Sequence, residues 1–198
     1  MLYNQHNLDV AKIASKNYVK PALAGVFFKK DRTVATDGYR LIEVMTPKDA
    51  DVADFPIADG MSTMKGCKPF IVDAKMLAGI KLPKKTSLPI LSNVAIKHID
   101  DKHVEFFTTN LETSEVKTVA RIDGNFPDYE SLFPTKEPVL EIQINGIYLA
   151  EIAMMLSKLS KFPEDVITIK LYGAEKPLVI EAGNINQSGR ALIMPVRK

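Results

Sequence analysis

The feature that most constrains this fold is an approximate internal repeat, in which a capped amphipathic helix is followed by three β-rich segments. The pattern occurs three times. One such repeat cannot by itself bury both the apolar face of its helix and the apolar face of its sheet, so the repeats are expected to pack on each other. We therefore predict an α+β fold of strand-helix-three-strand repeats, three per chain. Residues 1–66 and 67–135 would form one two-repeat domain and 136–198 a third repeat.

Each predicted helix begins after a polar residue that can cap it. Asn7 would cap a helix of about a dozen residues from Leu8, Asp73 a short helix, and Asn145 the helix at 146–161. The apolar residues expected to face inward are Val10, Ile13, Ala14 and Tyr18, then Met76, Leu77 and Ile80, then Tyr148, Leu149, Ile152, Met155, Leu156 and Leu159. The expected strands are 23–29, 69–72, 95–99, 104–109, 115–122, the alternating Leu140, Ile142 and Ile144, 166–171, 178–181 and 190–196.

The stretch 33–44 predicts a β-hairpin in the first repeat. Asp37-Gly38 supplies the positive-φ residues that a tight turn requires. Tyr39 and Arg40 would then emerge on a rigid strand rather than on a mobile loop, which is a good position for a binding surface. Asp-Gly hairpins are also common in β proteins of every function, so the stretch by itself favours a purely structural role.

Composition favours an intracellular globular protein. The net charge is +2, 46% of the residues are hydrophobic, and no apolar run reaches the length of a membrane span. The N-terminus lacks a signal peptide's apolar segment, and the single Cys67 fits a reducing compartment, so we expect a cytoplasmic protein with no membrane contact. Residues 46–66 read as a long acidic loop, with one short strand near 55–58.

Enzymatic chemistry is hard to find in the sequence. His6, His98 and His103 are scattered, and His98 and His103 flank a predicted turn, where solvated histidines are common. The sequence holds no nucleophile-elbow, phosphate-loop or zinc-protease motif. We therefore predict no catalytic site, no cofactor and no metal, with a hydrolase that uses Asp37 or Asp128 as a remote alternative.

Four phrases together resemble one known family. They are Ala-Thr-Asp-Gly-Tyr-Arg-Leu at 35–41, Leu-Pro-Ile-Leu-Ser-Asn at 88–93, Gly-Asn-Phe-Pro-Asp-Tyr at 124–129 with the following Leu132-Phe133-Pro134, and Met-Pro-Val-Arg at 194–197. On the repeat pattern described above, these phrases resemble the bacterial DNA sliding clamp, the β subunit of DNA polymerase III. The resemblance covers nearly the whole chain and leaves only 46–66 unmatched.

The resemblance implies a ring of such repeats, with helices lining a hole through which duplex DNA passes without sequence recognition. Lysines lie on or beside the predicted helices, where mobile ammonium groups suit sliding contact with phosphates. Lysines on the polar face of a helix are also ordinary. The DNA-contacting candidates are Lys12, Lys16, Lys20, Lys75, Lys81, Lys158 and Lys161.

The family also holds short linear peptides of polymerases, clamp loaders and repair proteins in one pocket. Here its aliphatic and proline walls would form an apolar cleft, and Arg40 and Arg197 could bind a carbonyl or carboxylate. Tyr39 stands where the family commonly has histidine. The pocket residues carried over are Leu23, Thr36, Gly38, Tyr39, Arg40, Leu41, Pro134, Ile193, Met194, Pro195, Val196 and Arg197.

The chain departs from the family in size, since family members carry six repeats and only three are visible here. Twelve repeats make the family's ring, so a homo-oligomeric ring of four chains would supply them, with one repeat of each chain pairing across a chain boundary. We predict a non-enzymatic processivity or tethering factor for a DNA polymerase. The alternative is a clamp-like peptide-binding module, a regulator or decoy, that does not encircle DNA.

Overall fold

The computed structural model describes residues 2–48, 50–56, 68–83, 88–160 and 165–196. It divides into two compact units, Met1–Tyr129 and Glu130–Lys198, which we call unit 1 and unit 2. The sequence predicted a division between residues 135 and 136. No helix in the described residues is long and apolar enough to cross a membrane.

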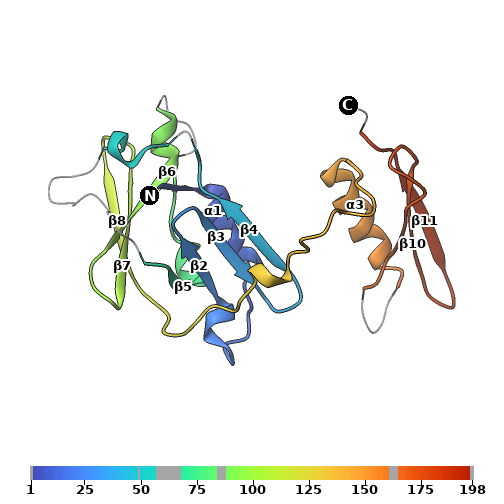
Figure 1. The fold of residues 1–198 in the computed structure, drawn as a ribbon, viewed down its shortest axis with the longest axis horizontal. Coiled ribbons are helices and arrows are strands. Elements are labelled where there is room, and N and C mark those ends of the chain that lie inside the picture. Colours follow the sequence, from blue (N-terminus) through green and yellow to red (C-terminus); the bar gives the residue numbers. More distant parts are fainter. Residues whose placement is uncertain (1, 49, 57–67, 84–87, 161–164, 197–198) are drawn as a thin grey trace. The chain divides into compact units, whose positions relative to one another are not determined.

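Unit 1 contains two antiparallel four-stranded sheets, and each sheet takes one strand from the other repeat (Figure 1). The strand that opens the first repeat, β1, joins the sheet of the second repeat in the order β1-β6-β7-β8. The strand that opens the second repeat, β5, joins the first sheet in the order β4-β3-β2-β5. The bounds are β1 Leu2–Asn4, β2 Gly25–Lys29, β3 Arg32–Thr36, β4 Leu41–Met45, β5 Phe70–Asp73, β6 Asn93–His98, β7 His103–Thr109 and β8 Ser114–Ala120.

The helices of unit 1 are shorter than the sequence predicted. The first is α1, Gln5–Asp9, continued by the 3-10 helix η1, Val10–Ile13. Its cap is Asn4, whose side chain accepts hydrogen bonds from the backbone N–H groups of His6 and Asn7, so the predicted cap at Asn7 is wrong. Asp73 caps α2, Ala74–Leu77, as predicted. Further 3-10 helices are η2 Pro21–Ala24, η3 Val52–Asp54 and η4 Pro89–Ser92.

Asn7 is instead a buried polar link between α1 and the first sheet. Its side-chain amide donates to the carbonyl oxygens of Val44 (2.9 Å) and Met45 (3.2 Å), and its backbone carbonyl accepts from the Thr33 hydroxyl at 2.9 Å. Its side-chain oxygen also accepts from the backbone N–H of Asn4, which completes a capping box. Because its side-chain donors and acceptor are used internally, Asn7 is fully buried without leaving polar atoms unpaired.

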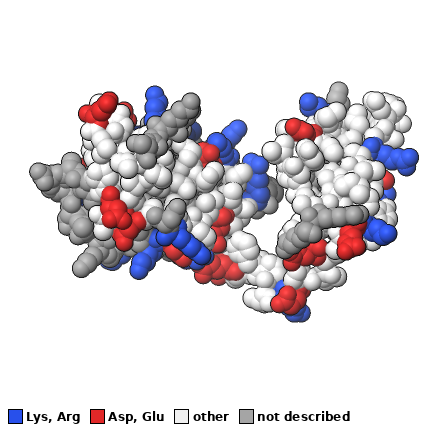
Figure 2. Space-filling model, turned by 90° about the horizontal axis from the view of Figure 1, so that it is seen from above, with Lys and Arg blue, Asp and Glu red and all other residues white. Residues whose placement is uncertain are grey.

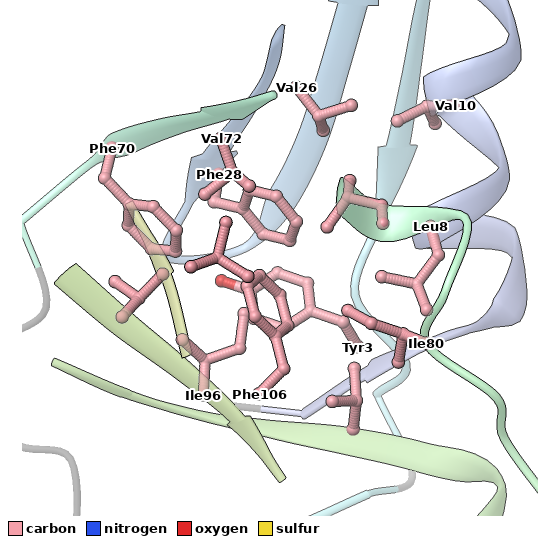
Figure 3. Packing of buried hydrophobic residues seen from close by; sticks show 14 of the residues in the cluster. Tyr3, Leu8, Val10, Val26, Phe28, Phe70, Val72, Ile80, Ile96 and Phe106 are labelled. Carbon is pink, nitrogen blue, oxygen red and sulfur yellow. The ribbon is translucent and has the colours of Figure 1, made fainter. Parts of the chain in front are cut away.

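One hydrophobic core joins the two repeats of unit 1, as the repeat argument predicted. Phe28 lies at its centre, with Phe70 stacked on it at 5.0 Å and Tyr3 and Phe106 packed edge-on (Figure 3). The helices contribute Leu8 from α1 and Leu77 from α2. Met76 was also predicted to face inward, but it is exposed, because its neighbour Leu77 occupies the inward position.

The described part of the predicted loop at 46–66 is packed against the protein rather than free. Phe55 is buried on the second sheet, with its ring edge-on to Phe107 at 6.0 Å, in a small cluster with Leu2 and Ala95. Phe55 and Pro56 lie outside any strand, and the rest of the predicted strand, together with Cys67, falls outside the described residues.

Unit 2 contains η5, one longer helix and one antiparallel sheet in the order β11-β10-β9. Asn145 caps the helix as predicted, by accepting from the backbone N–H groups of Ile147 and Tyr148. Leu156, Leu178, Ile180 and Ile193 form its core. The bounds are η5 Glu130–Leu132, α3 Gly146–Ser157, β9 Thr168–Lys170, β10 Leu178–Gly183 and β11 Ser188–Ile193.

Three predictions for unit 2 are wrong in detail. The helix ends at Ser157, before the predicted end. Tyr148 and Met155, predicted to face inward, are exposed, since each precedes the leucine that does face the core. The alternating segment 140–144 is not assigned as a strand, although Ile142 and Ile144 pack on the core.

Candidate peptide-binding and DNA-facing sites

The hairpin between β3 and β4 forms a tightly hydrogen-bonded loop at 37–40. The Asp37 carboxylate accepts from the backbone N–H groups of Tyr39 and Arg40 and from Arg40 Nε, each at 3.0 Å. The Thr36 hydroxyl donates to the Arg40 carbonyl oxygen at 2.8 Å. Gly38 takes φ +94°, the conformation for which a glycine was expected. The backbone N–H of Tyr39, followed by the Arg40 groups, lowers the pKa of Asp37.

Tyr39 and Arg40 lie in this loop and not on a strand, which corrects the sequence prediction. The Tyr39 side chain is 99% exposed, and Arg40 makes its ion pair with Asp37 at the surface. A ligand carboxylate could therefore reach Arg40 only in competition with Asp37. Leu23 is half-buried in η2, which contacts β3, and Leu41 begins β4.

The same loop closes the corresponding hairpin of every repeat. Asn110 between β7 and β8 accepts from the backbone N–H groups two and three residues later, and Asn184 between β10 and β11 does the same. Leu111 even adopts the positive φ, 75°, that Gly38 adopts in the first repeat. The hydrogen bonds of the 37–40 loop thus recur in every repeat, whereas the positive φ of Gly38 recurs at Leu111 and not at Ile185. The exposed Tyr39 and Arg40 side chains are particular to the first repeat.

The remaining pocket candidates belong to unit 2. Ile193 is buried at the end of β11, Pro195 is half-buried, and Met194 and Val196 are 56% and 53% exposed. Val196 N–H donates to the Gln143 carbonyl oxygen at 2.8 Å, which fixes the tail on the unit. Pro134 is exposed after η5, and Arg197 lies outside the described residues. Among the apolar candidates in the described residues, unit 1 therefore exposes Tyr39, and unit 2 exposes Pro134, Met194 and Val196.

Three of the predicted DNA-contacting lysines line one groove of about 650 Å³ in unit 1. Lys12 and Lys16 reach it from the first repeat and Lys75 from the second, over a floor that includes Leu8 and Leu77. The groove therefore lies where the two helical segments of unit 1 meet. Lys20 and Lys81 are exposed in the same unit, Lys158 is exposed in unit 2, and Lys161 lies outside the described residues.

The groove lysines have acidic and aromatic neighbours. Lys12 Nζ lies 3.0 Å from the Asp9 carboxylate, whose pKa is lowered by a hydrogen bond from Gln5 and by Lys12. Lys75 Nζ lies 4.5 Å from the centre of the Tyr18 ring. On the face shown in Figure 2, positive and negative side chains are interspersed on both units. An interspersed surface with a net charge of +2 suits weak rather than tight binding to a polyanion.

Sequence reasoning missed Lys117, a basic residue of β8 that contacts α2. Its Nζ donates to the carbonyl oxygen of Met76 in α2 at 2.5 Å, although β8 and α2 are far apart in the sequence. The contact places a cation at the C-terminal end of a helix, where the exposed carbonyls favour positive charge. The β-strand position of Lys117 gave no local signal, because only the packing of α2 beside β8 brings the two together.

His98 is not the solvated turn histidine that the sequence suggested. Its Nδ1 accepts a hydrogen bond from Arg121 Nη2, its ring packs edge-on against Phe70 at 5.1 Å, and its Nε2 is buried without a partner among the described residues. Burial, and then the positive charge of Arg121, lower the pKa of His98 from 6.5. His103 does lie in an exposed turn, paired with Asp100 at 3.0 Å.

His98 should therefore make the protein less stable in mild acid. Because its pKa is lower in the folded than in the unfolded state, the unfolded chain binds the extra proton as the pH falls below 6.5, and stability decreases. We expect His98→Gln, which keeps a hydrogen-bond acceptor but does not titrate, to reduce the fall in Tm between pH 7.5 and 5. Thermal unfolding across this range tests it, with the exposed His6→Gln as control; an unchanged pH dependence in His98→Gln would contradict the assignment.

The described residues contain no cluster of three or more histidine, cysteine, aspartate or glutamate side chains that could hold a metal ion. The carboxylate of Asp37 is used to shape its own loop.

The sequence matches no protein-family model and no curated protein, whereas solved structures match over the whole chain. The DNA polymerase sliding clamp of Bacillus subtilis covers 98% of this chain at 18% identity and a TM-score of 0.68. The β subunit from Streptococcus pyogenes DNA polymerase covers 100% at 15% identity and 0.67, and the Pseudomonas aeruginosa clamp covers 98% at 20% and 0.64.

The fold is thus that of the bacterial DNA polymerase sliding clamps, as the resemblance implied. The chain spans about half of these proteins, 48% of the Bacillus clamp and 50% of the other two.

Proposed function

We propose that this chain is a sliding-clamp-like processivity factor without a catalytic site of its own, which acts in the cytoplasm as a homo-oligomer. In this proposal it encircles or tethers duplex DNA without reading its sequence, and it binds linear peptides of polymerases, clamp loaders or repair proteins. The observation that carries the proposal is that the whole chain, both units included, matches the clamp fold.

The groove of unit 1 supports the DNA-binding part of the proposal. Lys12, Lys16 and Lys75 come from two repeats, and they present flexible cations over a largely apolar floor. Such a surface can contact phosphates but offers no fixed array of donors for base edges, so indifference to sequence is expected. The exposed Tyr39 and Met194 support the peptide-binding part, since exposed apolar side chains of this kind commonly anchor peptides.

Retention on circular DNA tests the proposal. A ring made of separate chains can assemble around a closed plasmid when the protein is concentrated in its presence, so no loader is needed. We expect the protein to stay with the circular plasmid during gel filtration at a salt concentration that removes simple phosphate binding, and to be lost when the plasmid is linearised. Equal loss from both forms, with peptide binding intact, would instead favour the non-encircling peptide-binding module.

A further inference from the structure

Unit 1 shows how two repeats complete one another. The opening strand of each repeat pairs with the first sheet strand of the other, β1 with β6 and β5 with β2. The described residues of unit 2 contain one repeat, whose sheet β11-β10-β9 ends at an unpaired β9 edge. Both opening strands of unit 1 are already paired within unit 1. The β9 edge of unit 2 is therefore open, and the opening strands of unit 1 are not available to pair with it.

The segment 141–144 of unit 2 occupies the position that β5 has in unit 1. In the second repeat, Ile122 N–H donates to the carbonyl oxygen of Ile71 at 2.8 Å, and Ile71 lies two residues before the helix cap Asp73. In unit 2, Val196 N–H donates to Gln143, also at 2.8 Å and two residues before the cap Asn145. The two donors, Ile122 and Val196, follow the first residues of β8 and β11 by the same interval. One edge of the segment is thus held as in β5.

The other edge of β5 pairs with β2, and the register of that pairing can be transferred to unit 2. In both exchanges of unit 1 the helix cap pairs with the first residue of the receiving strand, Asn4 with Asn93 and Asp73 with Gly25. Each receiving residue also lies opposite the last residue of the next strand when the hydrogen-bonded ladder is continued, Asn93 opposite Thr109 and Gly25 opposite Thr36. The same continuation of the β9–β10 ladder places Val166 opposite Gly183.

The exposure of two apolar residues also indicates that unit 2 is half of a domain. The residue four positions after the helix cap is a leucine in every repeat. Leu8 and Leu77 are only 3% and 2% exposed in unit 1, where two repeats share a core, whereas Leu149 in unit 2 is half-buried. Ile169, in the centre of β9, is 47% exposed. An apolar residue on an open sheet edge is a site where a further strand can add.

We propose that unit 2 completes itself with unit 2 of a second copy of this chain. Each copy adds its segment 141–145 to the β9 edge of the other, in the register Asn145 to Val166, Gln143 to Thr168 and Ile142 to Ile169. The partner must supply a segment that pairs with the β9 edge, and it must have an edge that pairs with segment 141–145. A second copy of unit 2 has both on the same surface. Such reciprocal contacts close around a twofold axis and use the β9 edge of both copies.

The contact makes one complete two-repeat domain from two half-domains, so a pair of chains contains six repeats. In such a pair, the third repeat of each chain has a repeat to pack against. The inference specifies the contact on which the proposed homo-oligomer rests, but it requires neither DNA nor peptide binding.

Disulfide trapping between two differently labelled chains tests the register. In a Cys67→Ser background, which removes the only natural cysteine, chains with Ile142→Cys are mixed with chains carrying Ile169→Cys. Directly opposed residues of antiparallel strands have Cα atoms about 4.5–5.5 Å apart, within the range of a disulfide. Mild oxidation is expected to give a covalent dimer of the 22.0 kDa chain in the mixture, and far less with either chain alone.

The matched control replaces Ile169→Cys with Thr168→Cys. A shift of one residue turns the thiol to the opposite face of the strand, so the yield should fall at least about tenfold. Equal yields, or no dimer in the matched mixture, would overturn the proposed contact. Sedimentation of the unmodified chain provides a check that no substitution can disturb: a 22.0 kDa species at every concentration would also overturn it. A failed disulfide trap, combined with retention on circular DNA, would leave the proposed function standing, whereas a 22.0 kDa species at every concentration would also contradict the proposed homo-oligomer.

Discussion

Reversing the charge of Lys12, Lys16 and Lys75 together is expected to weaken binding to duplex DNA on the order of a hundredfold at low salt. The three side chains line one groove, so a duplex that contacts the groove would meet all of them. Each lysine–phosphate contact releases about one counterion, and the slope of log K against log salt should therefore become shallower by about three. Fluorescence anisotropy with duplexes of two unrelated sequences at several salt concentrations measures both quantities.

The control is a second triple reversal, at Lys30, Lys48 and Lys102, which are exposed and lie outside the groove. Both variants change the formal net charge of +2 by the same amount, three substitutions of two charges each. A general charge effect would weaken binding equally in both. If the two variants lose the same affinity and the same salt slope, the groove has no special part in DNA binding.

The helix caps show what local sequence could and could not predict. Asp73 and Asn145 each stand alone before an apolar run, and both cap a helix as predicted. Asn4 and Asn7 are three residues apart, and each is a suitable cap on its own. The structure uses both in a capping box, with Asn4 at the cap and Asn7 turned inward to the backbone of β4. Only the packing of α1 on the sheet decides between them.

On α2 and α3, the sequence analysis predicted more core-facing residues than the structure shows. Met76, Tyr148 and Met155 each precede a leucine that faces the core, and neighbouring helical residues point roughly 100° apart. A helix as short as α2 has one inward position per turn, which Leu77 occupies. Apolar composition alone could not show which member of each pair faces the core.

The exchange of opening strands could not be predicted from local sequence. β1 pairs with β6, which lies far along the chain. The local sequence of neither strand indicates which strand it pairs with. The internal repeat did predict that repeats pack on each other, and the shared core around Phe28 confirms this for the two repeats of unit 1. For the peptide site, the residues came from the resemblance alone. The structure adds which of them are exposed and to which unit each belongs.

Tyr39 and Met194 are two exposed pocket residues that the resemblance implies, and each is expected to contribute to peptide binding. A peptide with a glutamine followed by leucine and a terminal Leu-Phe pair, the type that the resemblance implies, should bind with micromolar affinity, roughly 8 kcal/mol. Met194→Ala should remove on the order of 1 to 3 kcal/mol of this, because it truncates an apolar wall, and Tyr39→Ala should weaken binding similarly. Both side chains are more than half exposed, so neither change should unfold the protein. Isothermal titration calorimetry measures these affinities, with a scrambled peptide as reference.

Met154→Ala is the matched control, since it removes the same side chain at a similar exposure but from α3, outside the predicted pocket. Its affinity should equal that of the unmodified chain. The double variant Tyr39→Ala/Met194→Ala then decides whether the units act on one ligand. If both residues contact the same peptide, the two losses should couple rather than add. Strict additivity would indicate separate contributions, and a loss confined to one variant would assign the site to a single unit. Unchanged affinity in all three variants would mean that the clamp fold is present here without the clamp family's pocket.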